Sequence, residues 1–213
     1  MNLENNNMKP KIFIIGFNKT GTRSLHYFFK NNGLKSVHWD NAQLTKCFER
    51  NIALGNPLLD CGVVHNTKVN SPGVYDEMVV ISDMTNSITC RDAKDYYKRL
   101  DKDYPGSKFI LNVRDVDSWI VSRYEHMNGQ NIHEHLEFYG LSDTLSGHKT
   151  LKKIYMKMHE DYHRDTLRYF KNRDDDFLLF DLKNDNIDHV ISFLKDDYKL
   201  DSEHYNHMGK TSK

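Results

Sequence analysis

The sequence predicts an α/β fold in three layers, with a parallel central sheet flanked by helices on both faces. Short apolar runs alternate with helix-length segments along the chain, the order that a parallel sheet with helical crossovers requires. The runs KFILNV and FLLFDL are almost continuously apolar, as in strands that are buried on both faces. KIFIIG ends in a glycine and leads through a loop into a helix-length segment, so the chain opens as strand, loop and helix.

The runs also place the individual elements. We expect strands at 11–16, 36–39, 78–82, 108–113 and 177–182. We expect helices at 24–32, 41–54, 92–103, 116–127, 148–171 and 187–195. The segments 55–72 and 128–147 are rich in Asn, Gly and His and are expected to be irregular, either as substrate loops or as plain surface connections.

Length and charge limit the kinds of partner. The 213 residues are expected to form a single domain, 1–213, with a flexible start at 1–10. Thirty basic and thirty acidic residues give a formal net charge of zero, so no overall field attracts nucleic acid or an anionic membrane, and we expect neither as a partner. An anion site has to be local. Nothing in the sequence determines an oligomeric state.

The cysteines and the start of the chain bear on the cellular compartment. Cys47, Cys61 and Cys90 are odd in number and lack a CxxC spacing, which argues against a disulfide framework and a zinc ribbon and favours a reducing compartment. The start MNLENNNMKPK lacks the apolar core of a signal peptide, and no run approaches the ~20 apolar residues of a membrane span. We therefore expect a cytoplasmic protein.

The segment IIGFNKTGTRSL predicts a phosphate-binding loop. An apolar strand ends at Gly16, a loop carries a lysine, and a second glycine precedes a helix that starts with hydroxyl side chains. Backbone N–H groups and the positive end of the helix dipole then converge on an anion, and the lysine adds a full charge. The residues expected to bind the anion are Lys19, Thr20, Gly21, Thr22, Arg23 and Ser24.

The order of residues in this loop differs from that of ATP-binding loops. In GxxxxGK[ST] the lysine directly follows the second glycine, whereas here Thr22 holds that position and Lys19 precedes the glycine by two residues. The order KTGTxSL resembles the 5′-phosphosulfate loop of sulfotransferases that use 3′-phosphoadenosine-5′-phosphosulfate (PAPS), a family with the P-loop nucleotide-kinase fold. The resemblance implies that Lys19 contacts the phosphosulfate of the donor.

A second motif follows the fourth expected strand. An arginine at the carboxyl end of a strand and a hydroxyl on the next helix together suit a bound phosphate, and RDVDSWIVS supplies Arg114 and Ser122 in that way. Asp117 or Ser118 is expected to cap the helix, and Trp119 to pack in the core. The stretch resembles the family's RDP-x-x-W-x-x-S motif, which binds the 3′-phosphate. The proline of that motif is replaced by valine here.

The end of the chain resembles the family more loosely. There the family has a His-x-Asn element and a glycine followed by a basic residue, which His204, Asn206, Gly209 and Lys210 match. The resemblance implies that Lys210 reaches the nucleotide phosphates, with a disordered basic tail as the alternative. The resemblance covers 11–210, but only the two phosphate motifs are specific.

Three residues are candidates for the catalytic base. Asp83 follows the expected central strand MVVIS, and an acidic residue at that end of a strand faces the ligand crevice. His38 and His65 are the alternatives, and Asp83 could instead cap a helix or pair with Arg91. In the family the base is a histidine, glutamate or aspartate, and ISD resembles the branch with an aspartate.

Two groups of histidines are set aside as sites. HEDYH, from His159 to His163, matches HExxH, but the helix around it is charged on several faces and no third ligand follows nearby, so we expect no metal site. His133 and His135 could pair near an acceptor, but are expected to be solvated polar residues.

Together these motifs predict a sulfotransferase. The resemblance implies transfer of the sulfuryl group of PAPS to an acceptor hydroxyl or amine, release of 3′-phosphoadenosine-5′-phosphate (PAP), and no required metal. The acceptor is expected to be a small molecule or a carbohydrate. One alternative is an ATP-dependent small-molecule kinase of the same fold, with Asp83 as a magnesium ligand, and another is a catalytically inactive nucleotide-binding protein.

Overall fold

The central sheet has the predicted architecture. A computed structural model describes residues 9–61 and 75–206. Within these residues the sheet has five strands in the order β2-β3-β1-β4-β5, and every neighbouring pair is parallel. The strands are β1 (Ile12–Ile14), β2 (Ser36–His38), β3 (Val80–Ser82), β4 (Lys108–Val113) and β5 (Phe177–Asp181). The α/β fold with a parallel sheet flanked by helices is therefore confirmed.

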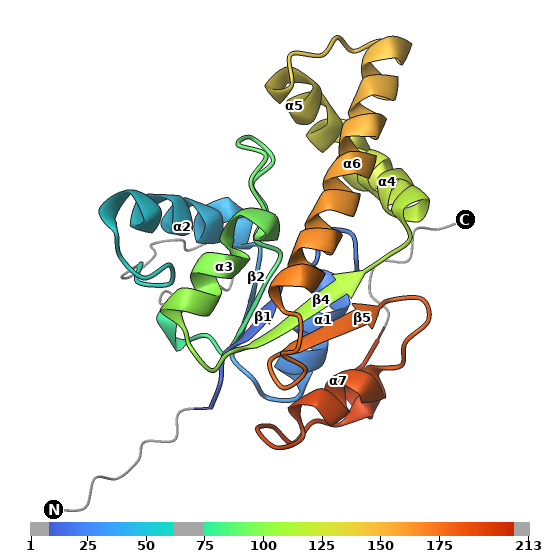
Figure 1. Cartoon of the computed structure of the whole chain (residues 1–213). Helices are drawn as coiled ribbons and strands as arrows, with labels where there is room; N and C mark the ends of the chain where they lie inside the picture. The colour runs from blue at the N-terminus through green and yellow to red at the C-terminus, as the bar shows by residue number, and fades with distance from the viewer. Residues whose placement is uncertain (1–8, 62–74, 207–213) are drawn as a thin grey trace, which may run out of the picture.

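Helices connect the strands (Figure 1). They are α1 (Thr22–Asn31), α2 (Gln43–Leu54), α3 (Ala93–Asp103), α4 (Val116–Glu125), α5 (Gln130–Phe138), α6 (Leu145–Tyr169) and α7 (Ile187–Leu194). Short 3-10 turns are η1 (Asp40–Ala42), η2 (Tyr75–Glu77), η3 (His126–Gly129) and η4 (Ser202–His204). No helix in the described ranges combines the length and the apolar character that crossing a bilayer requires.

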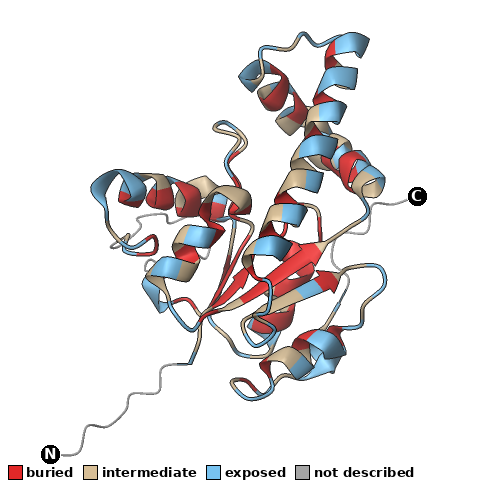
Figure 2. Cartoon of the chain, in the orientation of Figure 1, coloured by how far each residue is buried: buried red, intermediate tan, exposed pale blue. Residues whose placement is uncertain are grey.

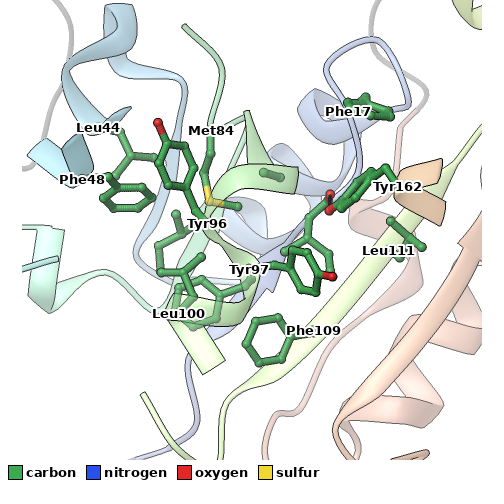
Figure 3. Close-up of a cluster of buried hydrophobic side chains, with 14 of the residues drawn as sticks. Phe17, Leu44, Phe48, Met84, Tyr96, Tyr97, Leu100, Phe109, Leu111 and Tyr162 are labelled. Atoms are coloured by element: carbon green, nitrogen blue, oxygen red, sulfur yellow. Dashed lines mark hydrogen bonds between the residues drawn. The ribbon is translucent and has the colours of Figure 1, made fainter. Parts of the chain in front are cut away.

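The alternation of side chains along β1 divides the core into two clusters. Ile12 and Ile14 face α1 and α7, whose apolar side chains complete one buried cluster. Phe13 faces the opposite side, where residues of α2, α3 and α6 form a second and larger cluster. Figure 3 shows part of this larger cluster, with Phe48 of α2, Tyr96 of α3 and Tyr162 of α6 labelled. Both faces of the sheet are thus covered, which makes three layers.

The winding of the chain positions the site. From β1 the chain passes through α1 to β2 at the far edge and returns to β3, and β4 then pairs with the other side of β1. The carboxyl ends of all five strands lie at one edge of the sheet because the strands are parallel. Ligands of such sheets bind outside the carboxyl ends, where the winding reverses direction. Here that point is the end of β1, where the predicted phosphate loop begins.

The segment expected to be irregular at 128–147 is largely helical, so this prediction is wrong. Ile132 and Leu136 are one helical turn apart and both are buried, which fixes α5 against its neighbours. His135 beside them is also buried, at 5% exposed, so it is not the solvated residue that we expected. The side chain of Thr144 caps α6. In Figures 1 and 2, α5 and the adjoining start of α6 extend beyond the sheet and carry much exposed surface.

One expectation about the cysteines is also wrong. A disulfide joins Cys47 of α2 to Cys61, with their Cα atoms 5.7 Å apart. Gly55, in the left-handed conformation at the end of α2, reverses the chain direction. Leu58 and Leu59 then pack in the core and bring Cys61 back to the helix. Cys90 is a free thiol. An odd number of cysteines therefore did not exclude a bridge between two of them.

Candidate active site

The predicted phosphate loop is pinned to the neighbouring strand by a single buried asparagine. Asn112 of β4 accepts a hydrogen bond from Gly16 N through its Oδ1 at 2.9 Å. Its Nδ2 donates to the carbonyl oxygen of Thr20 at 2.8 Å and to the hydroxyl of Thr20 at 2.7 Å. Asn112 is fully buried. The loop is therefore held at its start and near its end by one side chain that water does not reach.

Both glycines of the motif serve the packing of the loop. A Cβ atom on Gly16 would lie 2.1 Å from the carbonyl oxygen of Asn112, so no larger residue fits there. Gly21 has φ +89°, a conformation that favours glycine, and a Cβ there would meet Leu182 at 2.6 Å. The protein's own chain requires glycine at these two positions.

The start of α1 is arranged for an anion. Gly21 occupies the N-cap position, no side chain of the described residues caps the helix, and its first turn contains no acidic residue. The N–H groups of a first helical turn have no carbonyl partner within the helix, and the helix dipole favours negative charge there. Lys19 and Thr22 lie at this end of the helix, with Lys19 in the left-handed region at φ 69°.

Three cations meet around this helix start. Burial lowers the pKa of Lys19, the charge of Asp83 partly offsets this, and Arg114 and Arg23 lower the pKa further. Arg114 donates a hydrogen bond from Nη1 to the carbonyl oxygen of Lys19 at 3.4 Å. The two motifs predicted to bind phosphates therefore lie side by side, with three positive charges near one helix start.

Helix α4 packs against the same loop. Trp119 is fully buried, as expected for core packing, and donates from Nε1 to the carbonyl oxygen of Asn18 at 2.9 Å. Arg123 donates from Nη1 to Asn18 Oδ1 at 2.9 Å. Ser122 lies between these two residues in α4 and is 4% exposed. The helix face that carries Ser122 is thus turned toward the phosphate loop.

The cap of α4 differs from the prediction. Neither Asp117 nor Ser118 is the N-cap residue. Asp115 holds that position, and its carboxylate accepts a hydrogen bond from Ser118 N at 3.0 Å. The helix starts one residue after Asp115, which places Asp117 and Ser118 inside its first turn. The helix of the second phosphate motif therefore begins directly after Arg114 and Asp115.

Two of the three candidate bases are neighbours. The strands β2 and β3 pair in a register that sets His38 opposite Ser82, so Asp83 follows directly. Asp83 Oδ2 lies 3.3 Å from His38 Nε2, and the hydroxyl of Thr22 is 3.3 Å from the same nitrogen. The other carboxylate oxygen, Asp83 Oδ1, is buried and has no hydrogen-bond partner in the described chain. The third candidate, His65, lies outside the described residues.

Asp83 takes neither of the two structural roles considered for it, a helix cap or a partner for Arg91. The N-cap of α3 is Asp92, whose side chain accepts from Lys94 N, and Arg91 pairs with Asp95 at 3.0 Å. Asp83 has φ 52°, an uncommon conformation for an aspartate. Such backbone strain clusters at functional sites.

His126 was not identified from the sequence. Its Nδ1 lies 3.4 Å from Lys19 Nζ, and burial, followed by the charge of Lys19, lowers its pKa. His126 stands in η3 directly after α4, where the left-handed Met127 and Asn128 turn the chain. No spacing in the sequence signals the contact, because it joins residues 107 positions apart.

The HExxH histidines belong to the packing beneath the loop. His159 donates from Nε2 to the carbonyl oxygen of Arg114 at 3.2 Å. Its ring lies 4.0 Å from that of His163, and both rings pack near Phe17. Among residues 9–61 and 75–206, no three His, Cys, Asp or Glu side chains are grouped so that they could hold a metal ion.

The C-terminal match is described only in part. His204 is the last residue of η4 and is exposed, as is Asn206. The segment is attached to the end of α1 through Asp201 N, which donates to Asn32 Oδ1 at 2.7 Å. Gly209 and Lys210 lie outside the described residues, so the phosphate contact expected for Lys210 stays a prediction.

Comparison with known proteins identifies the family. Residues 11–200 match the sulfotransferase domain family. A crystal structure of a sulfotransferase from Alicyclobacillus acidocaldarius is similar, with 15% sequence identity, a TM-score of 0.48, and coverage of 91% of this chain and 85% of that chain. A search of curated proteins found no match. The family match covers most of the residues of this chain, so the chain belongs to the sulfotransferase domain family.

Proposed function

We propose that this protein is a PAPS-dependent sulfotransferase that transfers the sulfuryl group of PAPS to an acceptor hydroxyl or amine and releases PAP. The family supports sulfotransfer. The observation that carries the choice of donor is the contact between Arg114 and the carbonyl oxygen of Lys19, at 3.4 Å. It brings a cation for a second phosphate beside the loop for the first, as a donor with both a 5′-phosphosulfate and a 3′-phosphate requires.

The two ends of the donor have different partners in this proposal. The 5′-phosphosulfate binds at the uncapped start of α1, where Lys19 and the backbone N–H groups of Thr22, Arg23 and Ser24 surround it. Thr20, whose hydroxyl Asn112 already engages, contributes through its position in the loop. The 3′-phosphate binds Arg114 and Ser122, because an arginine and a hydroxyl offer several donors to one phosphate.

The reaction is a single in-line displacement. The acceptor oxygen or nitrogen attacks sulfur and forms a new bond, while the bond from sulfur to the bridging oxygen of the 5′-phosphate breaks. The electron pair of that bond stays on PAP, and negative charge grows on the bridging oxygen. Lys19 and the helix amides stabilise this charge because they are fixed before the reaction begins.

We propose Asp83 as the base that takes the acceptor proton, with His38 as its partner. Asp83 Oδ1 is a buried oxygen without a hydrogen-bond partner among the described residues, which suits an incoming hydroxyl. His38 holds the other oxygen at 3.3 Å. His38 can also accept the proton itself, and His65 remains a third candidate.

Calorimetric titration tests the donor. PAP should bind tightly in the presence of EDTA, because three cations and a helix start replace the metal that a kinase uses. A protein that binds ATP with magnesium but not PAP would instead be a kinase of this fold. Binding of neither nucleotide would favour an inactive interaction protein.

The cytoplasmic location stays a prediction.

A further inference from the structure

The side chain of Lys19 contacts a histidine and not a carboxylate. Its Nζ lies 3.4 Å from His126 Nδ1. No carboxylate oxygen of the described residues lies within 4.0 Å of this nitrogen, so Asp83 and Glu125 act on Lys19 only as more distant charges. An ammonium group only donates hydrogen bonds, so His126 Nδ1 is the acceptor and the ring proton is on Nε2. The contact uses one N–H of the ammonium and leaves two N–H groups and the positive charge for a ligand.

The surroundings of His126 favour its neutral form. Burial lowers the pKa of the ring most, and the charge of Lys19 lowers it further. Among the more distant charges, Asp83 raises this pKa and Arg123 lowers it. A protonated ring would place a second positive charge beside Lys19 and would have no lone pair with which to accept its N–H. The environment therefore keeps His126 in the state that can accept a hydrogen bond.

One face of α4 fixes both Lys19 and the residue before it. Trp119 Nε1 donates to the carbonyl oxygen of Asn18, and Arg123 Nη1 donates to its side-chain oxygen, each at 2.9 Å. His126 follows the last residue of α4 directly and contacts Lys19. The three positions have the spacing i, i+4 and i+7, which places them on the same face of a helix. The helix therefore holds the backbone of one loop residue and the side chain of the next.

The turn after α4 is anchored on both sides of His126. Before it, α4 is bonded to the phosphate loop. After it, Met127 and Asn128 have φ values of 51° and 54°, an uncommon conformation that turns the chain into α5. Ile132 and Leu136 then bury one face of α5. The position of His126 is thus set by two packed helices, and not by a free loop.

We infer that His126 is a positioning residue for sulfuryl transfer: its neutral ring accepts one N–H of Lys19 and so aims the two remaining N–H groups at the donor. The inference rests on the proposed function. A lysine ammonium stands on a flexible stem, so without a partner it occupies several positions. Charge that develops in a transition state is stabilised best by groups that are oriented before the reaction. A carboxylate in place of His126 would also orient Lys19, but it would compete with the anionic donor for the same charge.

A double-mutant cycle with labelled PAPS tests the inference without a known acceptor, because water can take the sulfuryl group. The water oxygen attacks sulfur, the bond from sulfur to the 5′-phosphate oxygen breaks, and PAP and labelled sulfate are released while the protons of the water pass to solvent. We expect His126→Leu to lower the rate of sulfate release about tenfold, with PAP affinity changed by less than about threefold. In the Lys19→Ala protein, His126→Leu should cause no further loss, because His126 acts through Lys19. Equal losses in both backgrounds would overturn the inference.

A conservative variant separates the hydrogen bond from packing. His126→Asn keeps an acceptor oxygen near the position of Nδ1, so it should recover most of the rate that His126→Leu loses. His189→Leu on α7, where the histidine side chain is 60% exposed, is the matched control and should leave the rate unchanged. If His126→Asn is as slow as His126→Leu, the hydrogen bond to Lys19 is not the cause and the inference is wrong.

NMR of the histidine ring nitrogens gives a test that needs no turnover. At neutral pH the ring of His126, identified by the signals that His126→Asn removes, should be neutral with its proton on Nε2. Its Nδ1 resonance should shift in Lys19→Ala, because the donor to this nitrogen is lost, and the ring resonances of His189 should not. A ring that carries its proton on Nδ1, or an Nδ1 resonance that does not move, would contradict the contact on which the inference depends.

The failure of this inference differs from a failure of the proposed function. If PAP binds and Lys19→Ala slows sulfate release but His126→Leu does not, the role of His126 is wrong and the donor assignment stands. If PAP does not bind to the unaltered protein, the proposed function itself is wrong.

Discussion

The two sides of the proposed active site are built in different ways. The proposed donor side, from Gly16 to Ser24, is held by one buried asparagine and by α4, and the groups that we propose as its ligands are mainly backbone N–H groups and one lysine. The proposed acceptor side, around His38 and Asp83, includes segments with left-handed backbone. Residues 39–42 have φ values of 58°, 51°, 51° and 60°, and Asp83 has 52°. A buried hydrogen bond between the Tyr75 hydroxyl and Asp40 fixes the first of these segments.

This difference separates a general function from a specific one. Backbone N–H groups at a helix start bind any suitably placed phosphate, so a short motif is sufficient for the donor side. The acceptor side uses side chains whose positions depend on strained loops and on contacts between distant helices. Changes on the donor side should therefore affect every acceptor equally, whereas changes on the acceptor side should depend on the acceptor.

The largest effect is expected at Lys19. Lys19→Ala removes a charge that the proposed transition state needs, which typically costs about 3 kcal/mol or more, or at least about a hundredfold in turnover. Turnover of every acceptor should fall together in a radiolabel assay, while circular dichroism shows an unchanged fold. Lys30→Ala, an exposed lysine at the end of the same helix, serves as the control. Near-normal turnover of Lys19→Ala would refute the donor assignment.

The next largest effect is expected at Asp83. Asp83→Asn keeps the shape, and asparagine tolerates the positive φ, but basicity is lost, so kcat should fall about a hundredfold with PAP affinity little changed. The kcat of His38→Ala should fall less than that of Asp83→Asn if the histidine only positions the carboxylate. Should Asp83→Asn remain active while His38→Ala or His65→Ala is inactive, the base is that histidine.

The 3′-phosphate contacts should give a smaller and more selective effect. Arg114→Ala and Ser122→Ala should weaken PAP binding more than binding of adenosine-5′-phosphosulfate, which lacks the 3′-phosphate. Charged hydrogen bonds contribute about 1.5–3 kcal/mol, so the loss at Arg114 should be roughly ten- to hundredfold and the loss at Ser122 smaller. Equal losses for both nucleotides, measured by calorimetry, would place these residues elsewhere.

The pinning of the donor side can be measured as stability. Asn112→Ala leaves the N–H of Gly16 and the carbonyl of Thr20 without their buried partner, which should cost about 2–3 kcal/mol in the free energy of unfolding. Urea denaturation compares it with Asn31→Ala at the exposed end of α1. A loss no greater than that of the control would show that the loop is held by other contacts.

The smallest effect, counted per pH unit, concerns acid stability. Burial lowers the pKa of His163 to about 3, well below its value in the unfolded chain. Between pH 6.5 and 3 the His163 ring binds a proton in the unfolded state but not in the folded state. The free energy of unfolding therefore falls as the pH falls, by up to about 1.4 kcal/mol per pH unit for one such group. His163→Leu should flatten this slope in urea denaturation, and the exposed His204→Ala should not. Asp92 has the opposite effect on the free energy of unfolding, because burial raises the pKa of its carboxyl to about 6.

Local patterns were sufficient for the fold and for the position of the loop between β1 and α1. Strand runs, the glycine-bearing loop and the arginine after β4 are short-range features, and the strands and most of the helices formed within a few residues of their expected bounds. The helix α5 was missed because its polar composition hides two buried apolar residues, Ile132 and Leu136. Their burial depends on neighbouring helices, which periodicity over nine residues cannot reveal.

Contacts between distant segments decided the rest. The pairing of β2 with β3 brought His38 to Asp83, and the turn after α4 brought His126 to Lys19 across 107 positions. The disulfide of Cys47 and Cys61, and the meeting of Arg123, His135 and Asp92 at one pocket, arise in the same way. A motif is visible in sequence when its groups lie on one turn or one helix. Groups that meet only through packing become neighbours when the chain folds.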